Sequence, residues 1–296
     1  MNVLMAEPRI AVVGATGAVG RVTLDLLADR GYRHVRAFAS ARSAGSVVAY
    51  GRRELVVEEA TPDRLAAGEI DLCFFSVGTD ASRELVPAAQ GSGVVCIDKS
   101  AAFRLSEGIP LVVPEVNGER ALEQDGIVAN PNCCTIPLTC VLKALDREAG
   151  LVRVRVATYQ SASGAGARRM ERLRGERPEE HDLAMDWSFD GVEFEEEAKL
   201  RAETRKILEL PELPVSATCV RVPVMIGHAE AVWVELEQPL GADAAREVLA
   251  AAPGLRIEDF PTPGKAAGTD DVLVGRIRED SAQTSLALFV VCDNLR

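Results

Sequence analysis

The most constraining feature of this 296-residue chain is a strand-like run that leads into regularly spaced glycines. Residues 9–13 (Arg-Ile-Ala-Val-Val) are typical of a strand, and Gly14, Gly17 and Gly20 follow before a helix-like stretch. Small residues at such a turn let backbone amides and a helix N-terminus approach a pyrophosphate. The spacing differs from the usual Gly-x-Gly-x-x-Gly, and a tight strand-to-helix connection would also explain it. The flanking strand and helix favour nucleotide binding.

Strand-like and helix-like segments then alternate along the first half of the chain. The expected elements are strands near residues 34–40, 55–58, 71–76 and 93–97 and a helix near 81–92. This alternation predicts an α/β fold with a Rossmann-type, doubly wound parallel sheet.

The pattern changes after the turn Asn130-Pro131-Asn132. The expected elements become a helix near residues 135–148 and strands near 151–159, 216–221, 228–236 and 285–292. We therefore predict a nucleotide-binding domain at 1–132 and a second domain, α+β with a mixed or antiparallel sheet, at 133–296. A charged segment at 168–206 is most simply the solvated face of a helix.

The charge balance limits the classes of partner. With 33 Lys plus Arg and 45 Asp plus Glu, the net charge is 33 − 45 = −12, which repels phosphate backbones and anionic lipid. No apolar run reaches the roughly 20 residues of a membrane helix, and Met1–Arg9 has no signal-type stretch. We expect a cytoplasmic protein that binds neither nucleic acid nor membrane.

The residues after the second predicted strand suggest which dinucleotide is bound. No Asp or Glu occurs from Gly31 to Arg53, where an NAD-specific fold places an acid on the ribose hydroxyls. Instead, Ser40, Arg42 and Ser43 occupy the strand end, and an arginine flanked by hydroxyls suits a 2′-phosphate. The sequence favours NADP, although an ordinary exposed loop arginine is the alternative for Arg42.

Seven cysteines include one adjacent pair, Cys133-Cys134. No Cys-x-x-Cys spacing occurs and the three histidines lie in unrelated contexts, so we predict no metal site. Cys133 follows a Pro-Asn turn and precedes a probable helix, whose N-terminus stabilises a thiolate. Cys134 would point elsewhere on the first turn. Cys133 is therefore a candidate nucleophile, and two buried cysteines at a domain junction are the alternative.

Six motifs occur in an order that resembles one family. They are Val12–Gly20, Ala129–Cys133, Thr158–Gly166, Val215–Val224, Gly227–Glu230 and Val274–Arg278. Together they resemble the aspartate-β-semialdehyde dehydrogenase family over almost the whole chain. The resemblance implies a catalytic and dimerisation domain like that of glyceraldehyde-3-phosphate dehydrogenase, and a homodimer or homotetramer.

The resemblance also implies a reaction in amino-acid biosynthesis, toward lysine, methionine, threonine and diaminopimelate. NADPH reduces L-aspartyl-4-phosphate to L-aspartate 4-semialdehyde and phosphate through a cysteine thioester. The chemistry of the residues agrees, because a thiolate can attack an acyl phosphate and imidazole exchanges protons near neutral pH.

Residue roles follow from the same resemblance. Cys133 is the nucleophile, Gln160 orients the acyl group, His228 is the general acid/base, and Arg221 pairs with the substrate α-carboxylate. Substrate contacts are further implied for Asn132, for Arg104 and Lys199 at the phosphate, and for Glu196 at the ammonium. The implied cofactor contacts are Gly14, Thr16, Gly17, Ala18, Val19, Ser40, Arg42, Ser43, Ser163 and Gly164.

The chain departs from the family pattern in three places. Cys134 stands where the family commonly has Ser, and the stretch from Gly166 to Glu193 is shorter than the family's insertion at the subunit contact. The sequence also stops at Arg296, where the family continues into a helix that contacts the cofactor, so we expect weaker NADP binding.

Two alternatives to this function stay open. One is an N-acetyl-γ-glutamyl-phosphate reductase, which Glu196 and the Arg221-to-His228 string disfavour. The other is a non-catalytic paralogue, against which the joint presence of Cys133, Gln160, Arg221 and His228 argues.

Overall fold

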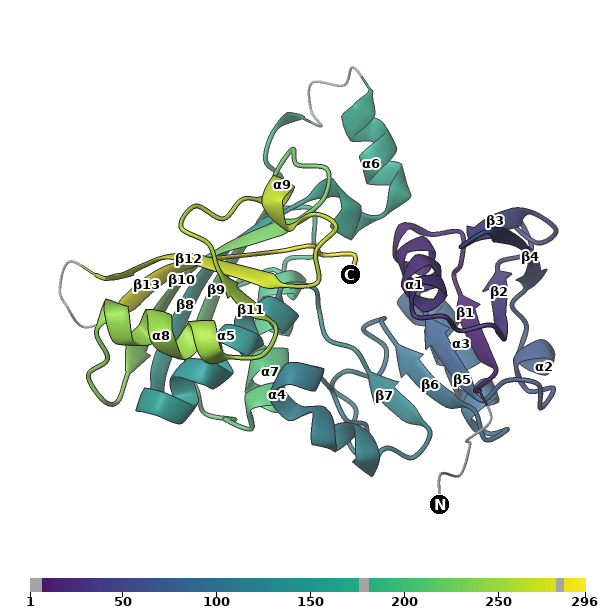
Figure 1. The fold of residues 1–296 in the computed structure, drawn as a ribbon, viewed down its shortest axis with the longest axis horizontal. Helices are drawn as coiled ribbons and strands as arrows, with labels where there is room; N and C mark the ends of the chain where they lie inside the picture. Colours follow the sequence, from purple (N-terminus) through teal and green to yellow (C-terminus); the bar gives the residue numbers. More distant parts are fainter. Residues whose placement is uncertain (1–6, 176–180, 281–284) are drawn as a thin grey trace. The chain divides into compact units, whose positions relative to one another are not determined.

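The computed structural model describes residues 7–175, 181–280 and 285–296, which form two compact units. The first unit comprises the chain up to Val112 together with Glu119–Asn130, and the second comprises Val113–Gly118 and Pro131–Arg296 (Figure 1). The chain passes from the first unit to the second at residues 130/131, two residues before the predicted boundary at 132/133. Part of the N-terminal stretch Met1–Arg9 and part of the charged segment 168–206 lie outside the described residues.

A seven-stranded sheet forms the centre of the first unit. Its strands are β1 (Ile10–Val13), β2 (Val35–Ala39), β3 (Val47–Tyr50), β4 (Arg53–Glu59), β5 (Leu72–Phe75), β6 (Val95–Asp98) and β7 (Ile127–Ala129). They lie in the order β3-β4-β2-β1-β5-β6-β7, and every pairing is parallel except the β3–β4 hairpin. The predicted Rossmann-type sheet is confirmed, and the antiparallel β3 was not anticipated.

Helices pack on both faces of this sheet because the side chains of β1 alternate between two cores. The helices of the first unit are α1 (Ala18–Asp29), α2 (Pro62–Leu65) and α3 (Thr79–Gln90). Ile10 and Val12 share a core cluster with Leu24 of α1, whereas Ala11 and Val13 share another with Val86 of α3. Period-two alternation in a strand that is covered on both sides produces this arrangement.

The glycine turn between β1 and α1 has a strict steric requirement. Gly14 has φ +89°, and a Cβ there would lie 2.2 Å from the carbonyl oxygen of Ser76. A Cβ on Gly20 would lie 2.1 Å from the carbonyl oxygen of Gly14. These glycines let strand and helix backbones meet, which leaves the N-terminus of α1 facing the turn.

The second unit is built on a mixed six-stranded sheet. Its strands are β8 (Leu151–Gln160), β9 (Val215–Arg221), β10 (His228–Leu236), β11 (Leu255–Ile257), β12 (Val272–Glu279) and β13 (Leu286–Cys292), in the order β11-β12-β13-β10-β8-β9. Two pairings, β8 with β9 and β11 with β12, are parallel and the others are antiparallel. This sheet confirms the predicted mixed second domain.

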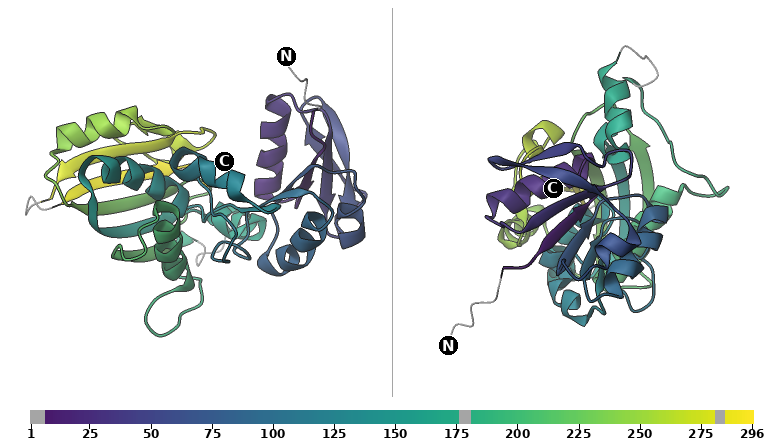
Figure 2. Two further views of the ribbon diagram at one scale, coloured as in Figure 1. Left: turned by 90° about the horizontal axis from the view of Figure 1, so that it is seen from below. Right: turned by 90° about the vertical axis from the view of Figure 1, so that its right-hand side faces the viewer.

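Three helices of the second unit form a layer on one face of this sheet (Figure 2). The elements of the unit besides its strands are α4 (Pro114–Asn117), α5 (Thr135–Ala149), η2 (Ala162–Ala165), α6 (Ala167–Arg174), α7 (Glu195–Leu208), α8 (Ala242–Ala251) and α9 (Pro263–Ala266), while η1 (Gly118–Glu123) joins the two units. Helix α5 packs on β8, β10 and β13, flanked by α7 on β9 and α8 on β11 and β12. Within the described residues, no helix is both long and apolar enough to cross a membrane.

We expect Gly20→Ala to lower the free energy of unfolding by about 1–3 kcal/mol or more, because the added Cβ meets backbone atoms that cannot move independently. Gly78→Ala is the matched control: Gly78 precedes α3 as Gly17 precedes α1, and a Cβ at Gly78 has no neighbour within 4 Å. Urea denaturation of the two variants measures the difference. Equal losses would contradict the steric role assigned to Gly20.

Candidate active site

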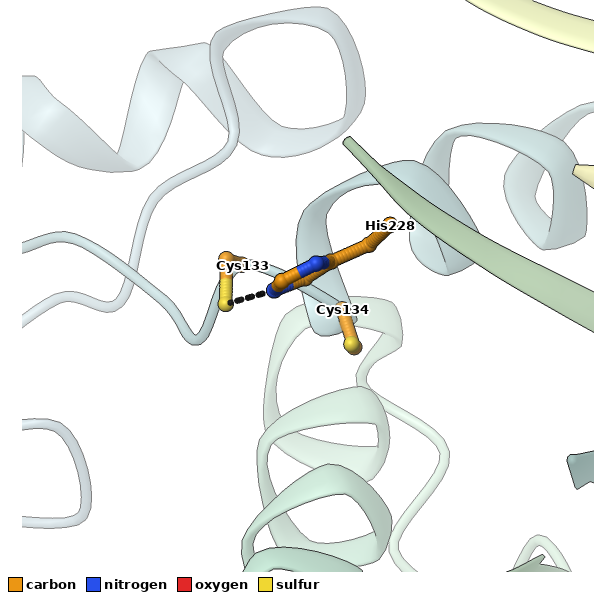
Figure 3. Close-up of side chains that lie close together, drawn as sticks. All are labelled: Cys133, Cys134 and His228. Carbon is orange, nitrogen blue, oxygen red and sulfur yellow. Dashed lines mark hydrogen bonds between the residues drawn. The ribbon is translucent and has the colours of Figure 1, made fainter. Parts of the chain in front are cut away.

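The predicted nucleophile lies at the turn that leads into α5. Cys133 is partly exposed, whereas Cys134, the N-cap residue of α5, is 1% exposed. The Asn132 side chain holds the turn by accepting a hydrogen bond from the Cys134 amide at 2.8 Å. The Cys133 sulfur lies 3.2 Å from Nε2 of His228, which begins β10 (Figure 3). The two residues, 95 positions apart in sequence, therefore form a thiol–imidazole pair.

The tautomer of His228 follows from its second nitrogen. The Ser161 backbone N–H donates to Nδ1 at 3.0 Å, so Nδ1 carries no proton in the neutral ring. The remaining proton sits on Nε2 and points at the Cys133 sulfur. His228 is thus arranged to donate a hydrogen bond to a thiolate, and later to an oxyanion at the same place.

A hydrogen-bond network around Asn294 fixes this histidine from behind. The Oδ1 atom of Asn294 accepts from the Gly227 amide at 2.8 Å and from the Ser161 hydroxyl at 3.0 Å, and Nδ2 donates to the Ser163 hydroxyl at 2.9 Å. Gly164 lies against the imidazole, since a Cβ there would be 3.0 Å from Nε2 of His228. No motif in the sequence pointed to Asn294 as part of the site.

One carboxylate, that of Glu196 on α7, connects two of the predicted substrate-binding amides. Its Oε1 atom accepts from Nδ2 of Asn132 at 2.9 Å and from Nε2 of Gln160 at 3.0 Å. Glu203, about two helical turns further along α7, accepts a hydrogen bond from the Asn132 backbone N–H at 2.6 Å. Because all these groups are buried, the hydrogen bonds fix the amide orientations beside Cys133.

Part of the charged segment, on α7, is buried rather than forming the expected solvated face. Glu196, Glu197 and Glu203 are each less than 9% exposed, since α7 packs on α5 and β9. Glu197 accepts the Cys219 amide of β9 at 2.9 Å and also caps its own helix. Tertiary hydrogen bonds keep these acids inside, and the pattern of charges along the helix could not reveal them.

Lys199, which the resemblance placed at the substrate phosphate, pairs with an acid of its own helix. Its Nζ lies 2.6 Å from Oε1 of Glu195, at the i,i+4 spacing, rather than beside Glu196. Its side chain is 26% exposed, so the ammonium can still meet a soluble anion.

Arg221, at the end of β9, is buried and already engaged. Its Nη1 donates to the Ser161 carbonyl at 2.9 Å, and its Nε donates to the Asp186 carboxylate at 3.1 and 3.3 Å. The guanidinium carbon lies 4.8 Å from the centre of the Trp187 ring. The arginine predicted to bind the substrate carboxylate therefore already binds a carboxylate of the protein, that of Asp186. The two residues are 35 positions apart, and no spacing in the sequence predicts their pairing.

The remaining predicted residues belong to the first unit. Arg104 donates from Nε to the Asn130 carbonyl at 2.9 Å and from Nη2 to the Lys99 carbonyl at 2.8 Å. Residues Thr16, Gly17, Ala18 and Val19 form the turn and the first residues of α1. Ser40, Arg42 and Ser43 lie on the turn after β2, where Arg42 is exposed.

Two buried side chains that stay protonated, those of Cys134 and Glu230, lie next to the nucleophile. Burial raises the pKa of the Cys134 thiol well above its usual value, so this cysteine stays protonated. Burial and the neighbouring Cys133 raise the pKa of Glu230, and although the Cys134 thiol interacts with this acid, neither carboxyl oxygen has a partner with hydrogen-bond geometry among the described residues. The Sγ atoms of Cys133 and Cys134 and a ring nitrogen of His228 all lie within 4.8 Å of one another, a proximity that the sequence spacing did not predict.

We expect Glu230→Gln to increase the free energy of unfolding more at neutral pH than at pH 4.5. The folded chain keeps Glu230 protonated, whereas the unfolded chain ionises it above its ordinary pKa of 4.5. The folded state is therefore favoured by this group below that pKa and loses the advantage as the pH rises. Urea denaturation of both proteins at the two pH values measures it. A pH-independent difference would mean that Glu230 titrates normally in the folded protein.

Comparisons with known proteins identify the family. Residues 9–124 match the description "Semialdehyde dehydrogenase, NAD binding domain" and residues 187–296 match "Semialdehyde dehydrogenase, dimerisation domain". The aspartate-semialdehyde dehydrogenases of Mycolicibacterium smegmatis and Aquifex aeolicus (strain VF5) are 42% and 40% identical over 97% of this chain, and 94% and 93% of the relatives are covered. The crystal structure of aspartate semialdehyde dehydrogenase II from Vibrio cholerae is 36% identical with a TM-score of 0.92, over 98% of this chain and 94% of that one. The chain therefore belongs to the aspartate-semialdehyde dehydrogenase family.

Proposed function

We propose that this protein catalyses the NADPH-dependent reductive dephosphorylation of L-aspartyl-4-phosphate to L-aspartate 4-semialdehyde and phosphate. The observation that carries the proposal is the 3.2 Å contact between Cys133 and a histidine whose Nε2 proton is fixed toward it. A Vibrio cholerae relative, 35% identical over 99% of this chain, was solved in complex with ASA, which supports the same substrate class here.

The first step is attack of the Cys133 thiolate on the acyl carbon. A C–S bond forms as the C–O bond to phosphorus breaks, and phosphate leaves with the electron pair of that bond. Nε2–H of His228 stabilises the thiolate before attack and donates to the acyl oxygen as negative charge develops there. The fixed amide of Gln160 adds a second polar contact to the acyl group.

The nicotinamide, when bound, supplies the hydride that reduces the thioester. The protein then holds a hemithioacetal oxyanion on Cys133, which collapses as the C–S bond breaks. The leaving thiolate is again the group that Nε2–H of His228 faces, so one proton position serves the beginning and the end of the cycle.

Substrate binding follows from the charges of the site. We assign the α-carboxylate to Arg221, where it would replace the carboxylate of Asp186, and the ammonium to Glu196, whose Oε2 accepts no hydrogen bond from the described residues. Asn132 is assigned to the substrate through its fixed amide, and Arg104 and Lys199 to the phosphate. A free ammonium next to a buried carboxylate favours aspartyl phosphate over an N-acetylated substrate, which has no positive charge there.

The cofactor assigned to the first unit is NADP. The residues fit a dinucleotide, because Gly14 and Gly20 leave no room for a Cβ and α1 starts at the turn. The contacts assigned to it are those of Gly14, Thr16, Gly17, Ala18 and Val19 with the pyrophosphate, those of Ser40, Arg42 and Ser43 with the 2′-phosphate, and those of Ser163 and Gly164 with the nicotinamide end. Arg42 is suited to this role because it is exposed and makes no ion pair within the described residues.

The sheet face of the second unit opposite the helix layer supports a homodimer. Trp233 and Phe289 are partly exposed on neighbouring strands, and Phe260 nearby is 66% exposed. The match to a dimerisation domain covers all three residues. A cytoplasmic location is supported by the seven cysteines, all free, as expected in a reducing compartment.

The direct test of the function is a steady-state assay with aspartate semialdehyde, phosphate and NADP, followed by NADPH absorbance. Turnover with this substrate, and none with the N-acetylglutamate semialdehyde analogue, is the expected result. The reverse preference would favour the N-acetyl-γ-glutamyl-phosphate reductase, and no turnover with either would favour a non-catalytic paralogue.

Cys133→Ser is expected to lower kcat by about a thousandfold or more, since the hydroxyl cannot form the thioester at a useful rate. Cys134→Ser is the matched control and should keep most of the activity, because the Cys134 sulfur is buried and stays protonated. Steady-state kinetics and iodoacetamide labelling of each variant provide the measurement. Equal losses would remove the assignment of Cys133 as nucleophile.

Arg42→Ala should reduce the preference for NADPH over NADH, expressed as the ratio of kcat/KM, by about tenfold to a hundredfold. This range corresponds to the loss of one or two charge-assisted hydrogen bonds. Arg52→Ala is the control, because this arginine is also exposed but lies on the β3–β4 turn. That turn is at the amino ends of the parallel strands, whereas the glycine turn is at their carboxyl ends. An unchanged ratio in Arg42→Ala would show that the 2′-phosphate is bound elsewhere.

A further inference from the structure

Three soft donor atoms converge at the nucleophile. The Sγ atoms of Cys133 and Cys134 and a ring nitrogen of His228 lie within 4.8 Å of one another, and the Cys133–His228 distance is 3.2 Å. Ligand atoms around a tetrahedral zinc lie about 3.5–3.8 Å apart, given metal–sulfur and metal–nitrogen bonds of about 2.3 and 2.0 Å. Closing the set needs only a change of about 1 Å at Cys134, within the reach of a side-chain rotation.

A second observation points to a cation at the same place. Glu230, two residues after His228 on β10, is 1% exposed and neither of its oxygens has a hydrogen-bond partner among the described residues. Its carboxyl group interacts with both Cys133 and Cys134. Buried polar atoms without partners are rare in native proteins and commonly mark the position of an ion or a water.

The chemistry of the donors selects the kind of cation. Two thiolates and an imidazole are the ligands that zinc and cadmium prefer, whereas magnesium and calcium prefer oxygen donors. Cys133 is partly exposed, so a cation can enter from the substrate side without opening the fold. Cys134 matters most, because without it only a two-ligand pair remains.

We propose that Cys133, Cys134 and His228 bind a thiophilic divalent cation such as Zn²⁺, which reversibly inhibits the enzyme by occupying its nucleophile. Two metal–sulfur bonds and one metal–nitrogen bond form. Each thiol loses its proton to solvent, and the Nε2 proton of His228 moves to Nδ1, which then donates to the Ser161 hydroxyl 3.2 Å away instead of accepting from the Ser161 amide. No electron is transferred. The cation is an inhibitor and not a resident cofactor. The binding part of this inference stands on the geometry alone, while the inhibition part rests on the proposed function.

Binding is tested first with Co²⁺, whose thiolate charge-transfer absorption reports bonds to sulfur. Under anaerobic conditions with a reductant that does not bind metals, the wild type is expected to bind one Co²⁺ and Cys134→Ser to lose about half of the absorption, since one of two thiolates is gone. Cys134→Ala, which removes the side-chain donor entirely, repeats the test should the serine variant fold poorly. Cys219→Ser is a matched control, because Cys219 is also buried but lies on β9 outside the cluster.

Inhibition is tested with Zn²⁺ in the dehydrogenase assay. The inhibition constant is expected to rise at least about tenfold in Cys134→Ser and Cys134→Ala, because one of three metal–ligand bonds is lost. A chelator should restore wild-type activity in full. The proposal is overturned by unchanged Zn²⁺ inhibition and an unchanged Co²⁺ spectrum in both variants, or by the absence of stoichiometric Co²⁺ binding to the wild type. If the chain proves inactive, the Co²⁺ spectrum still decides whether the metal site exists.

Discussion

The chemistry of the site depends on one hydrogen bond, from the Ser161 amide to Nδ1 of His228. It determines which nitrogen holds the proton, and therefore what Cys133 faces. Without it, either nitrogen could be protonated and the imidazole could rotate. Asn294 reinforces the bond by holding both the Ser161 hydroxyl and the Gly227 amide, so the histidine is fixed at the strand start and at the ring.

The second constraint is the burial of charge behind the nucleophile. Glu196 and Glu203 are tolerated inside because backbone and side-chain amides donate to them, including those of Asn132 and Gln160. Among the described residues no amide donates to Glu230, and burial keeps it a neutral acid beside Cys133. Two glutamates thus organise the polar side of the site as acceptors, and the third avoids placing a negative charge against a thiolate.

The Asp186–Arg221 pair shows how the protein treats an unsatisfied cation. A guanidinium buried at the end of β9 would be costly alone, and the Asp186 carboxylate and the Ser161 carbonyl satisfy it. Because Asp186 is partly exposed, a substrate carboxylate can exchange with it. The arginine can therefore be kept ready for an anion without an uncompensated charge before substrate binds.

The sequence determined the features that depend on neighbours along the chain. Period-two runs fixed the strands, the glycine spacing fixed the β1–α1 turn, and the turn before α5 set Cys133 apart from Cys134. The order of motifs was enough to recognise the family. These features could be predicted because local backbone geometry and strand or helix periodicity produce them.

Only the tertiary structure decided which side chains satisfy one another. The thiol–imidazole pair, the Glu196 contacts, the Asp186–Arg221 pair and the Asn294 network each join residues at least 35 positions apart. The same cause explains why α7, whose charges suggested a solvated face, buries three glutamates. Hydrogen bonds in a low-dielectric interior outweigh the pattern of charges along a helix, and their partners are set by how α5, α7, β9 and β10 pack.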